Sequence, residues 1–323
     1  MPRAKGAADA TARGGAERET KSGTASALSL GNAARGAEGI GETESSKLAP
    51  GLYLVATPIG NLADITLRAL EVLRGADAVL CEDTRVTAKL FQRYGIAAAT
   101  KPYHDHNAER ARPEILARLK AGAALALVSD AGTPLVSDPG YKLVRAALAD
   151  GIAVTVVPGP SAALTALLGS GLPPDRFLFA GFLPPKAAAR RRELDALKAV
   201  DATLVFFESA PRLAASLADM ADILGPRSAA VARELTKLHE EMRRESLAEL
   251  AAHYRAAGPP KGELVLVVGP PAPAAASDAQ VDHALGAALA HKSLRAAVEE
   301  VAAATGARRR HVYARALALK GGR

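Results

Sequence analysis

Four short turns rich in glycine and proline are the parts of this sequence best suited to hold a ligand. They occupy residues 57–62, 129–140, 158–162 and 208–212, and each follows a run of mainly apolar residues. Small residues allow a ligand to approach the backbone closely, and the N–H groups exposed in such turns can bind it. None of the turns has the spacing of a P-loop or of a Gly-x-Gly-x-x-Gly dinucleotide loop, so we expect neither an ATPase nor a nicotinamide dehydrogenase.

Ionisable side chains gather in two other short segments. In the first, Asp83 and Arg85 form either a solvated turn with a local ion pair or a polar edge of the cleft that the glycine- and proline-rich turns would line. In the second, Asp105 stands between His104 and His106. No third ligand of known spacing follows the two histidines. We therefore expect a polar, substrate-facing loop there and no metal site.

The turns are positioned by an alternation of short apolar runs and segments with helical periodicity. Buried strands are predicted at 52–56, 76–81, 124–128 and 151–157. Helices are predicted between and after them, at 64–73, 87–94, 108–121, 139–148 and 161–168. Such alternation predicts an α/β fold with a parallel sheet whose two faces are covered. Ligands collect at the carboxyl ends of such strands, so the first three turns are expected to line one cleft.

The pattern changes after residue 172 and predicts a second α/β domain whose sheet could be mixed. Its strands are expected at 176–182, 203–208, 229–233 and 263–269, and its helices at 188–199, 213–224 and 247–257. We place an N-terminal domain at 49–168, a second domain at 169–270, a linker at 271–280 and two or three short helices in 281–323. Residues 1–48 contain almost no large apolar side chains, which predicts a disordered extension.

Composition excludes several classes of protein. The single cysteine, Cys81, rules out a disulfide framework, and no apolar run is long enough for a membrane-spanning helix. The net charge of +7 is concentrated at the end, because residues 280–323 hold eight basic and three acidic residues. The basic run Arg308, Arg309 and Arg310 is either a solvated face or a set of contacts to RNA phosphates. Tryptophan is absent and aromatic residues make up 4%, which argues against a base-stacking platform.

Several motifs in order along the chain carry a family resemblance. They are Leu-Val-Ala-Thr-Pro-Ile-Gly-Asn-Leu at 54–62, Glu-Asp-Thr-Arg at 82–85, Ser-Asp-Ala-Gly-Thr-Pro at 129–134, Ser-Asp-Pro-Gly-Tyr at 137–141, Pro-Gly-Pro-Ser-Ala at 158–162 and Ala-Arg-Glu-Leu-Thr-Lys at 232–237. Together they resemble the 16S rRNA cytidine 2′-O-methyltransferases of the tetrapyrrole methylase superfamily. The resemblance runs from about residue 52 to 268 and is weaker in 293–319. One departure is that Ala210 and Pro211 precede Arg212 without the histidine of Ser-Pro-His-Arg.

The resemblance implies S-adenosylmethionine as methyl donor, bound in a cleft between two α/β domains. It also implies a cytoplasmic homodimer that acts on 16S rRNA in the 30S subunit, with no membrane association. Carried over motif by motif, the donor contacts would be Pro58, Ser129, Asp130, Ala131, Gly132, Gly159, Pro160, Ser161, Ala162, Arg233 and Glu234.

The implied reaction needs a group that removes the proton of a ribose 2′-hydroxyl. The candidates are Asp83, Asp105 and Glu208, with His104 and His106 as further possibilities. Arg85 and Lys237 would contact RNA phosphate or the developing oxyanion, or else belong to surface ion pairs. The alternatives are a small-molecule tetrapyrrole or diphthine-type methylase and a non-catalytic RNA-binding protein.

Overall fold

The structure is a computed structural model that describes residues 47–130, 132–137, 140–272 and 276–321. The expected disordered extension lies almost wholly outside the described residues. The same holds for Ala131 of the expected donor site and for the middle of the expected linker.

The first sheet is parallel throughout, as the alternation predicts, with the strand order β3-β2-β4-β1-β5. Its central strands are buried along their whole length because every side chain faces a helix layer. The elements are β1 (Gly51–Val55), a 3-10 turn η1 (Leu62–Asp64), α1 (Leu67–Gly75), β2 (Ala78–Cys81), α2 (Thr84–Tyr94), β3 (Thr100–Pro102), α3 (Ala108–Lys120), β4 (Ala124–Val128), α4 (Tyr141–Ala149) and β5 (Val154–Val157).

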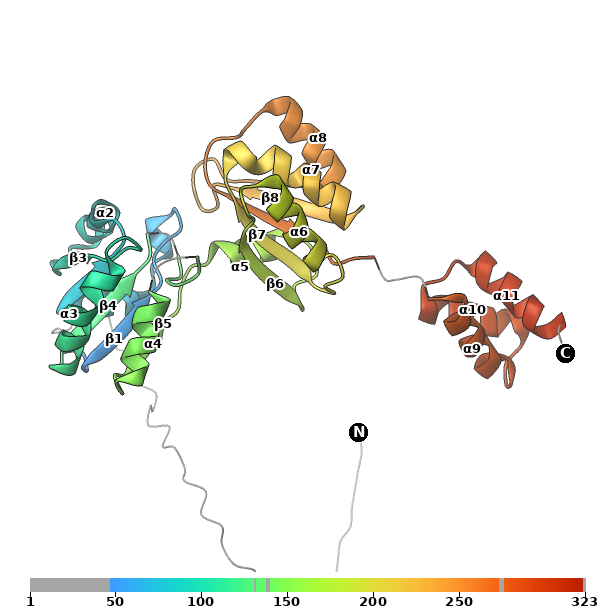
Figure 1. Cartoon of the computed structure of the whole chain (residues 1–323), viewed down its shortest axis with the longest axis horizontal. Helices are drawn as coiled ribbons and strands as arrows, with labels where there is room; N and C mark the ends of the chain where they lie inside the picture. Colours follow the sequence, from blue (N-terminus) through green and yellow to red (C-terminus); the bar gives the residue numbers. More distant parts are fainter. Residues whose placement is uncertain (1–46, 131, 138–139, 273–275, 322–323) are drawn as a thin grey trace, which may run out of the picture. The chain divides into compact units, whose positions relative to one another are not determined.

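Helices cover both faces of this sheet (Figure 1). On one face, Val55 and Val79 pack in a cluster with Leu73 of α1 and Phe91 of α2. On the other face, Leu127 packs in a second cluster with residues of α3 and α4. Alternate residues of each strand therefore enter two separate cores, which fixes the strand register.

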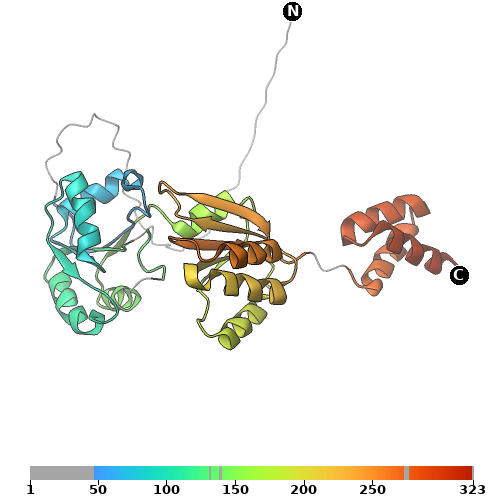
Figure 2. The same ribbon diagram turned by 90° about the horizontal axis from the view of Figure 1, so that it is seen from above.

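The second sheet is mixed, with the order β6-β7-β10-β8-β9, and only β6 and β7 run parallel. Figures 1 and 2 show three helices, α6, α7 and α8, on one face of it. The elements are α5 (Ala162–Ser170), β6 (Phe177–Phe182), α6 (Ala187–Leu197), β7 (Thr203–Glu208), a 3-10 turn η2 (Ala210–Arg212), α7 (Leu213–Leu224), β8 (Ser228–Arg233), β9 (Glu241–Ser246), α8 (Leu247–Ala257) and β10 (Leu264–Val268).

Helix α5 covers the opposite face of the second sheet. Its Ala166 and Leu167 are buried against Val205, Ala230 and Val267. The expected boundary at residue 168 assigns this helix to the first domain, whereas its apolar side packs on the second sheet.

Two strands were not predicted from the sequence, and both lie at sheet edges. Strand β9 reads Glu-Met-Arg-Arg-Glu-Ser and pairs only with β8, so one side of the strand needs no buried partner. Strand β3 has three residues and ends in Pro102, which cannot donate to a ladder. Edge strands of this kind lack the apolar run that identifies a buried strand.

Helix starts differ from the expected ones because of local capping. The Asp83 side chain accepts the Arg85 N–H, so α2 begins at Thr84 and not at residue 87. The Thr66 side chain accepts the Ala69 N–H, so α1 begins at Leu67 after a separate 3-10 turn.

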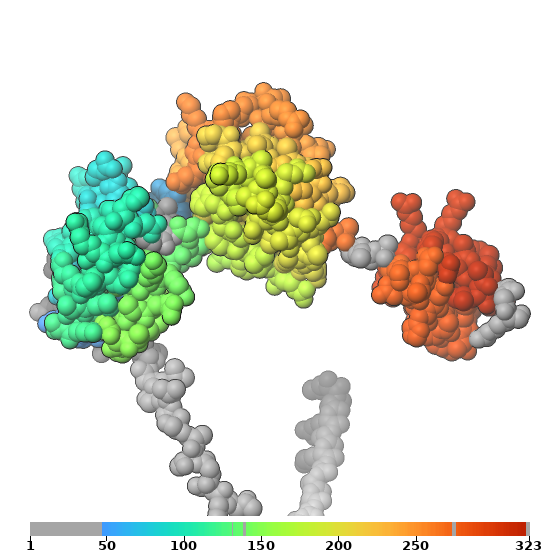
Figure 3. Space-filling model, viewed as in Figure 1, coloured from blue at the N-terminus to red at the C-terminus, as the bar shows by residue number. Residues whose placement is uncertain are grey.

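The last described segment forms three helices, as expected: α9 (Asp278–Leu289), α10 (Leu294–Thr305) and α11 (Arg309–Gly321). They share a core of their own that includes Val281, Leu285, Val298 and Val312. The orange-red atoms of Figure 3 show these helices as one compact cluster. A separate core indicates that this segment does not depend on either sheet for its apolar burial.

Candidate functional site

The turns that follow β1, β4 and β5 are held together by hydrogen bonds at the carboxyl edge of the first sheet. The Thr57 hydroxyl donates to the Ser129 carbonyl at 2.8 Å, and the Thr57 N–H donates to the Gly132 carbonyl at 2.9 Å. The Thr133 hydroxyl donates to the Pro160 carbonyl at 3.1 Å. The three turns predicted to line one cleft are thus directly bonded to one another.

Glycine is required where these turns approach each other most closely. Gly132 has φ +93°, and a Cβ added there would lie 2.9 Å from Cγ2 of Ile59. At Gly159, an added Cβ would lie 3.0 Å from Cβ of Ala56. The close contacts explain why the turns use residues without a side chain.

The segment after β8 meets the first turn. The Asn61 N–H donates to the Thr236 hydroxyl at 3.0 Å, across 175 residues of sequence. A Cβ added to Gly60 would lie 2.5 Å from Cγ of Lys237. The motif residues of the two sheets are therefore in contact here.

Lys237 is held by two carboxylates. Its Nζ lies 2.8 Å from Oε1 of Glu234 and 2.9 Å from Oε2 of Glu263. These bonds raise the pKa of Lys237 despite the opposing effect of burial, and the Lys237 hydrogen bond lowers the pKa of Glu234. Both predicted site residues are thus engaged in an ion-pair network that shapes the loop, and their charges are largely neutralised.

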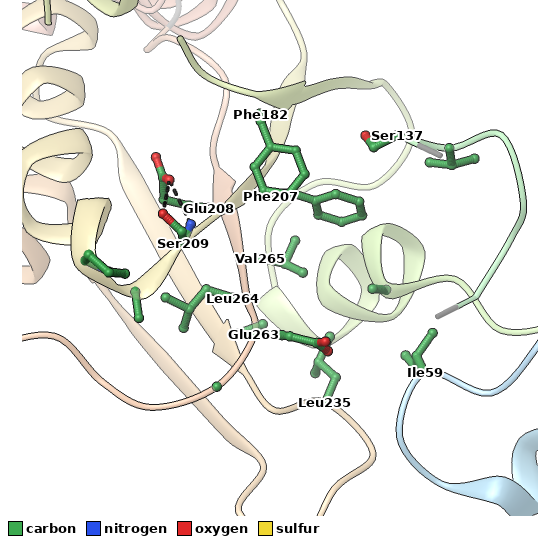
Figure 4. A pocket seen from close by; sticks show the side chains of 16 residues that line it. Ile59, Ser137, Phe182, Phe207, Glu208, Ser209, Leu235, Glu263, Leu264 and Val265 are labelled. Carbon is green, nitrogen blue, oxygen red and sulfur yellow. Dashed lines mark hydrogen bonds between the residues drawn. The ribbon is translucent and has the colours of Figure 1, made fainter. Parts of the chain in front are cut away.

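A cavity of about 510 Å³ opens beside this network (Figure 4). Its walls are mainly apolar, and Figure 4 shows the Phe182 and Phe207 rings side by side. Two predicted site residues, Ala162 and Glu208, line it. The other lining residues are Ile59, Val136, Ser137, Phe182, Phe207, Ser209, Ala210, Pro211, Ala232, Leu235, Gly262, Glu263, Leu264 and Val265.

Most residues of this apolar wall were missed by sequence reasoning. Phe207 and Val265 lie in strands, where an apolar run is read as core. Their contribution to a cavity depends on which face of the strand remains uncovered, and the sequence pattern does not encode that. The available signals were the lining residues inside predicted turns, which are Ile59 at 57–62, Val136 and Ser137 at 129–140, and Ser209, Ala210 and Pro211 at 208–212.

Glu208 is almost fully buried, with a side chain 1% exposed. Its Oε1 accepts the Ser209 N–H at 2.7 Å, and its Oε2 accepts the Ser216 hydroxyl at 2.5 Å. Nε of Arg212 lies 3.3 Å from Oε1. Figure 4 shows the bonds to Ser209. This carboxylate anchors the start of η2 and α7, a role that competes with proton abstraction.

Asp83 and Asp130 form a carboxylate pair at the ends of β2 and β4. The Asp83 N–H donates to Oδ1 of Asp130 at 3.2 Å. The Arg85 side chain bonds both oxygens of Asp83 and, with the Arg85 N–H, lowers its pKa to about 2. Burial raises the pKa of Asp130. The two environments therefore make Asp130 a stronger base than Asp83.

The histidine segment after β3 is a braced loop at the same sheet edge. The Asn107 side chain accepts the His104 N–H at 2.9 Å and donates to the Pro102 carbonyl at 2.9 Å. Asp105 and His106 are exposed. Among the described residues there is no group of three or more His, Cys, Asp or Glu side chains that could hold a metal ion.

The remaining predicted residues do not meet at this cavity. Arg233 lines a second cavity, where its Nε bonds Oε2 of Glu241 at 3.0 Å. Arg308, Arg309 and Arg310 are exposed at the start of α11.

Backbone strain gathers in the two loops beside the first cavity. Four non-glycine residues in the described chain have positive φ: Leu135, Ser137, Glu234 and Thr236. They belong to the loop after β4 and to the loop after β8, and such outliers concentrate at ligand sites. Their position indicates that these loops are shaped for binding.

Comparison with known proteins places this architecture in a defined class of methyltransferases. Residues 51–251 match the family Tetrapyrrole (Corrin/Porphyrin) Methylases, and residues 275–320 match the RsmI C-terminal HTH domain. A protein of Mesorhizobium japonicum named ribosomal RNA small subunit methyltransferase I is 56% identical over 87% of this chain and 97% of its own. A protein of the same name from Erythrobacter litoralis is 56% identical over 84% of this chain and 96% of its own.

Solved structures show the same fold at low identity. Uroporphyrin-III-C-methyltransferase from Thermus thermophilus has a TM-score of 0.51 and 24% identity, covering 68% of this chain and 94% of its own. Diphthine synthase has a TM-score of 0.53 and 18% identity, covering 68% and 89%. The chain belongs to the tetrapyrrole methylase family, in the branch named ribosomal RNA small subunit methyltransferase I.

None of the described helices is both long and apolar enough to cross a membrane.

Proposed function

We propose that this protein transfers a methyl group from S-adenosylmethionine to the 2′-hydroxyl of cytidine 1402 (rRNA numbering) in 16S rRNA. The observation that carries the proposal is the 56% identity to proteins named ribosomal RNA small subunit methyltransferase I over 84–87% of the chain. The matched C-terminal domain supports it, because that domain follows the methylase body in this chain.

The first cavity fits S-adenosylmethionine in volume and in the chemistry of its walls. Its volume of about 510 Å³ lies in the range of cofactor sites, and its apolar walls suit an adenine ring and an aliphatic chain. The bonded turns at 57–62, 129–137 and 158–162 offer backbone groups for the polar parts. Ala162 lines the cavity, and the bonded turns also hold Pro58, Ser129, Gly132, Gly159, Pro160 and Ser161.

When bound, the sulfonium supplies an activated methyl group. The ribose oxygen forms a bond to the methyl carbon as the carbon–sulfur bond breaks, and the hydroxyl proton passes to a base. Asp130 lies at the carboxyl edge of the first sheet, outside the lining of the first cavity, and its raised pKa makes it a stronger base than Asp83 for this role. Asp83, held by Arg85, would keep the local charge fixed.

The RNA would be held in part by the C-terminal helices. Arg308, Arg309 and Arg310 are exposed and have no carboxylate partner among the described residues. By contrast, Arg315 of the same helix bonds Asp282 and stabilises the bundle. Free guanidinium groups in a row suit sequence-independent phosphate contacts.

We also propose a homodimer that acts on the 30S subunit in the cytoplasm. Strands β5 and β6 lie at the edges of their sheets and expose Val156 (57%) and Phe177 (43%). Helix α5 exposes Leu168 (73%). Open edges with large apolar side chains are commonly covered by a partner, and a second copy would supply one.

The test is to incubate the protein with methyl-labelled donor and 30S subunits, or with protein-free rRNA, and to map the modified ribose. We expect label on one cytidine 2′-oxygen of 16S rRNA. Label on no RNA, together with transfer to a tetrapyrrole or to a diphthine precursor, would reject the proposal. An Asp130→Asn protein serves as the control for label that does not depend on the site.

A further inference from the structure

A second cavity of about 340 Å³ lies at the end of β8, where it is lined by Arg233. Its basic and polar lining comes from Arg233, His253, Tyr254 and Lys261, and its one acidic group is Glu241. Nothing in the methyl-transfer reaction proposed above uses this cavity.

Two segments, the end of β8 with the loop after it and the loop before β10, contribute residues to both cavities. Ala232 and Leu235 line the first cavity, whereas Arg233 lines the second. Likewise, Gly262 and Glu263 line the first cavity, and Lys261 lines the second. The end of β8 and the segment before β10 therefore contribute to both cavities.

Two polar atoms of this region are buried without a partner. The Tyr254 hydroxyl makes no well-aligned hydrogen bond although the residue is only 5% exposed; the Arg243 side chain faces it, and Nε of Arg243 is in the same state. Burial is the largest effect on the Tyr254 hydroxyl and raises its pKa, so it remains an O–H donor at neutral pH. Buried polar atoms in proteins are usually hydrogen-bonded, so a polar group from outside the chain could complete these two.

Positive charge exceeds negative charge around the cavity. Glu241 is shared by Arg233 at 3.0 Å and Arg243 at 3.7 Å, and Arg243 also bonds Glu245 at 3.0 Å. Lys261 is exposed and has no ion pair within the described part of the chain. Three cations therefore face two carboxylates, and one of the cations is free to take an anion.

We propose that the second cavity binds a phosphate group through Lys261, Arg233 and the Tyr254 hydroxyl, and that this phosphate belongs to the RNA strand whose ribose enters the first cavity. This inference rests on the proposed function. A phosphate oxygen accepts hydrogen bonds from all three groups, and an arginine and a hydroxyl together suit its geometry. A free phosphate anion has the same chemistry, so the experiment separates the two sources.

The experiment compares Lys261→Ala and Tyr254→Phe with the wild-type full-length protein in steady-state methylation of 30S subunits. We expect KM for the subunit to rise about threefold to tenfold in each variant, with kcat and the KM for S-adenosylmethionine unchanged. The salt dependence of binding should lose about one unit of slope in Lys261→Ala. Lys198→Ala, which removes one lysine outside both cavities, should change none of these values.

Tyr254→Phe separates binding from folding. Removing an unpartnered buried hydroxyl should leave Tm equal or higher, so a rise in KM with no loss of Tm supports a ligand contact. Unchanged KM and salt slope in both variants, with an active wild-type protein, would overturn the inference and leave the proposed function standing. An inactive wild-type protein would instead reject the proposed function.

A parallel measurement uses inorganic phosphate as the probe. If millimolar phosphate raises Tm of the wild-type protein but not of the variants while KM for the 30S subunit is unaffected, the bound group is a free anion and the RNA assignment is wrong. The RNA assignment is supported if the variants lose the phosphate-dependent rise in Tm and also show a raised KM for the 30S subunit.

Discussion

Asp83 combines two roles in one side chain, a helix cap and an ion-pair partner. It accepts the Arg85 N–H at the start of α2 and also bonds the Arg85 guanidinium. Since its pKa falls from the ordinary 3.8 to about 2, the folded state holds the carboxylate charged at a pH where the unfolded chain binds a proton. Its stabilising effect is therefore complete above about pH 4 and is lost as the pH falls towards 2.

We predict that Asp83→Asn removes this acid sensitivity while keeping the cap. Asparagine caps helices about as well as aspartate, so urea unfolding near pH 6 should show only a small loss of stability. Between pH 4 and pH 2, the wild-type protein should lose more stability than the variant. Asp83→Ala serves as the control that loses both the cap and the charge. Parallel losses in wild type and Asp83→Asn across this range would contradict the prediction.

The neighbouring Asp130 should govern activity at low pH. Its raised pKa means that it takes up a proton at a higher pH than an ordinary aspartate, and the protonated form is no base. We expect kcat to decline with falling pH through this pKa. Asp130→Asn should lower kcat by roughly 10²-fold or more, the usual contribution of a general base. The assignment of Asp130 as the base is supported if the decline of kcat with falling pH is unchanged in Asp83→Asn and is absent from the residual activity of Asp130→Asn. Single-turnover rates of methylation across pH give the measurement.

Gly132 gives a matched pair of substitutions. Gly132→Ala places a methyl group 2.9 Å from Ile59 at a positive φ, whereas Gly151→Ala has a similar positive φ with nothing within 4 Å. Both should cost about 1 kcal/mol or more of unfolding free energy from backbone strain. Only Gly132→Ala should also weaken S-adenosylmethionine binding by calorimetry, because it displaces the turn at Ile59. Equal donor affinity in both variants would argue against a binding role for this turn.

At the scale of elements, β5, α5 and β6 each carry large apolar side chains that are exposed. Leu164 and Leu168 of α5 are 46% and 73% exposed, although the other side of the helix is buried on the second sheet. A helix with apolar residues on both sides is typical of a buried element. This pattern is the physical basis for the proposed dimer.

We predict that Leu168→Glu produces monomers. A carboxylate at the centre of an apolar contact is costly to desolvate, so the interface should not form. Leu148→Glu on α4 is the control, since Leu148 is 58% exposed outside this region. Sedimentation velocity at micromolar concentration distinguishes the outcomes. A wild-type monomer, or a variant that dimerises like the wild type, would refute the dimer.

For the whole molecule, the net positive charge is concentrated in the C-terminal segment. Residues 49–279 hold 26 basic and 25 acidic residues, whereas residues 280–323 carry a net charge of +5. A nearly neutral body thus holds the cavity, and the helices α9 to α11 hold the surplus charge on a core of their own. This arrangement suits a large anionic substrate whose binding is mostly electrostatic.

We predict that replacing Arg308, Arg309 and Arg310 by glutamine weakens binding to 30S subunits and lowers the slope of log K against log salt by about two to three units. Donor affinity by calorimetry should stay the same, because the proposed donor cavity lies in the methylase body. Deleting residues 280–323 should have the larger effect of the same kind. Unchanged affinity for 30S subunits in both proteins would contradict an RNA-binding role for the tail.

The sequence by itself determined the α/β alternation, the glycine- and proline-rich turns and the family. These features are local, because a buried strand needs a continuous apolar run and a close turn needs glycine or proline. The motifs at 57–62, 129–134 and 158–162 are therefore predicted to share one sheet edge, and the structure bonds these turns to one another.

Only the tertiary structure decided what each charged residue of those motifs faces. Lys237 is neutralised by Glu234 and Glu263. Glu208 accepts a hydrogen bond from Ser216 of α7, and Arg233 lines a second cavity. The polar edge strand β9, which supplies Glu241 to that cavity, leaves no apolar signature. The physical reason is that an ion pair or a cavity wall depends on side chains brought together from distant parts of the chain, and their pairing is set by packing rather than by local spacing.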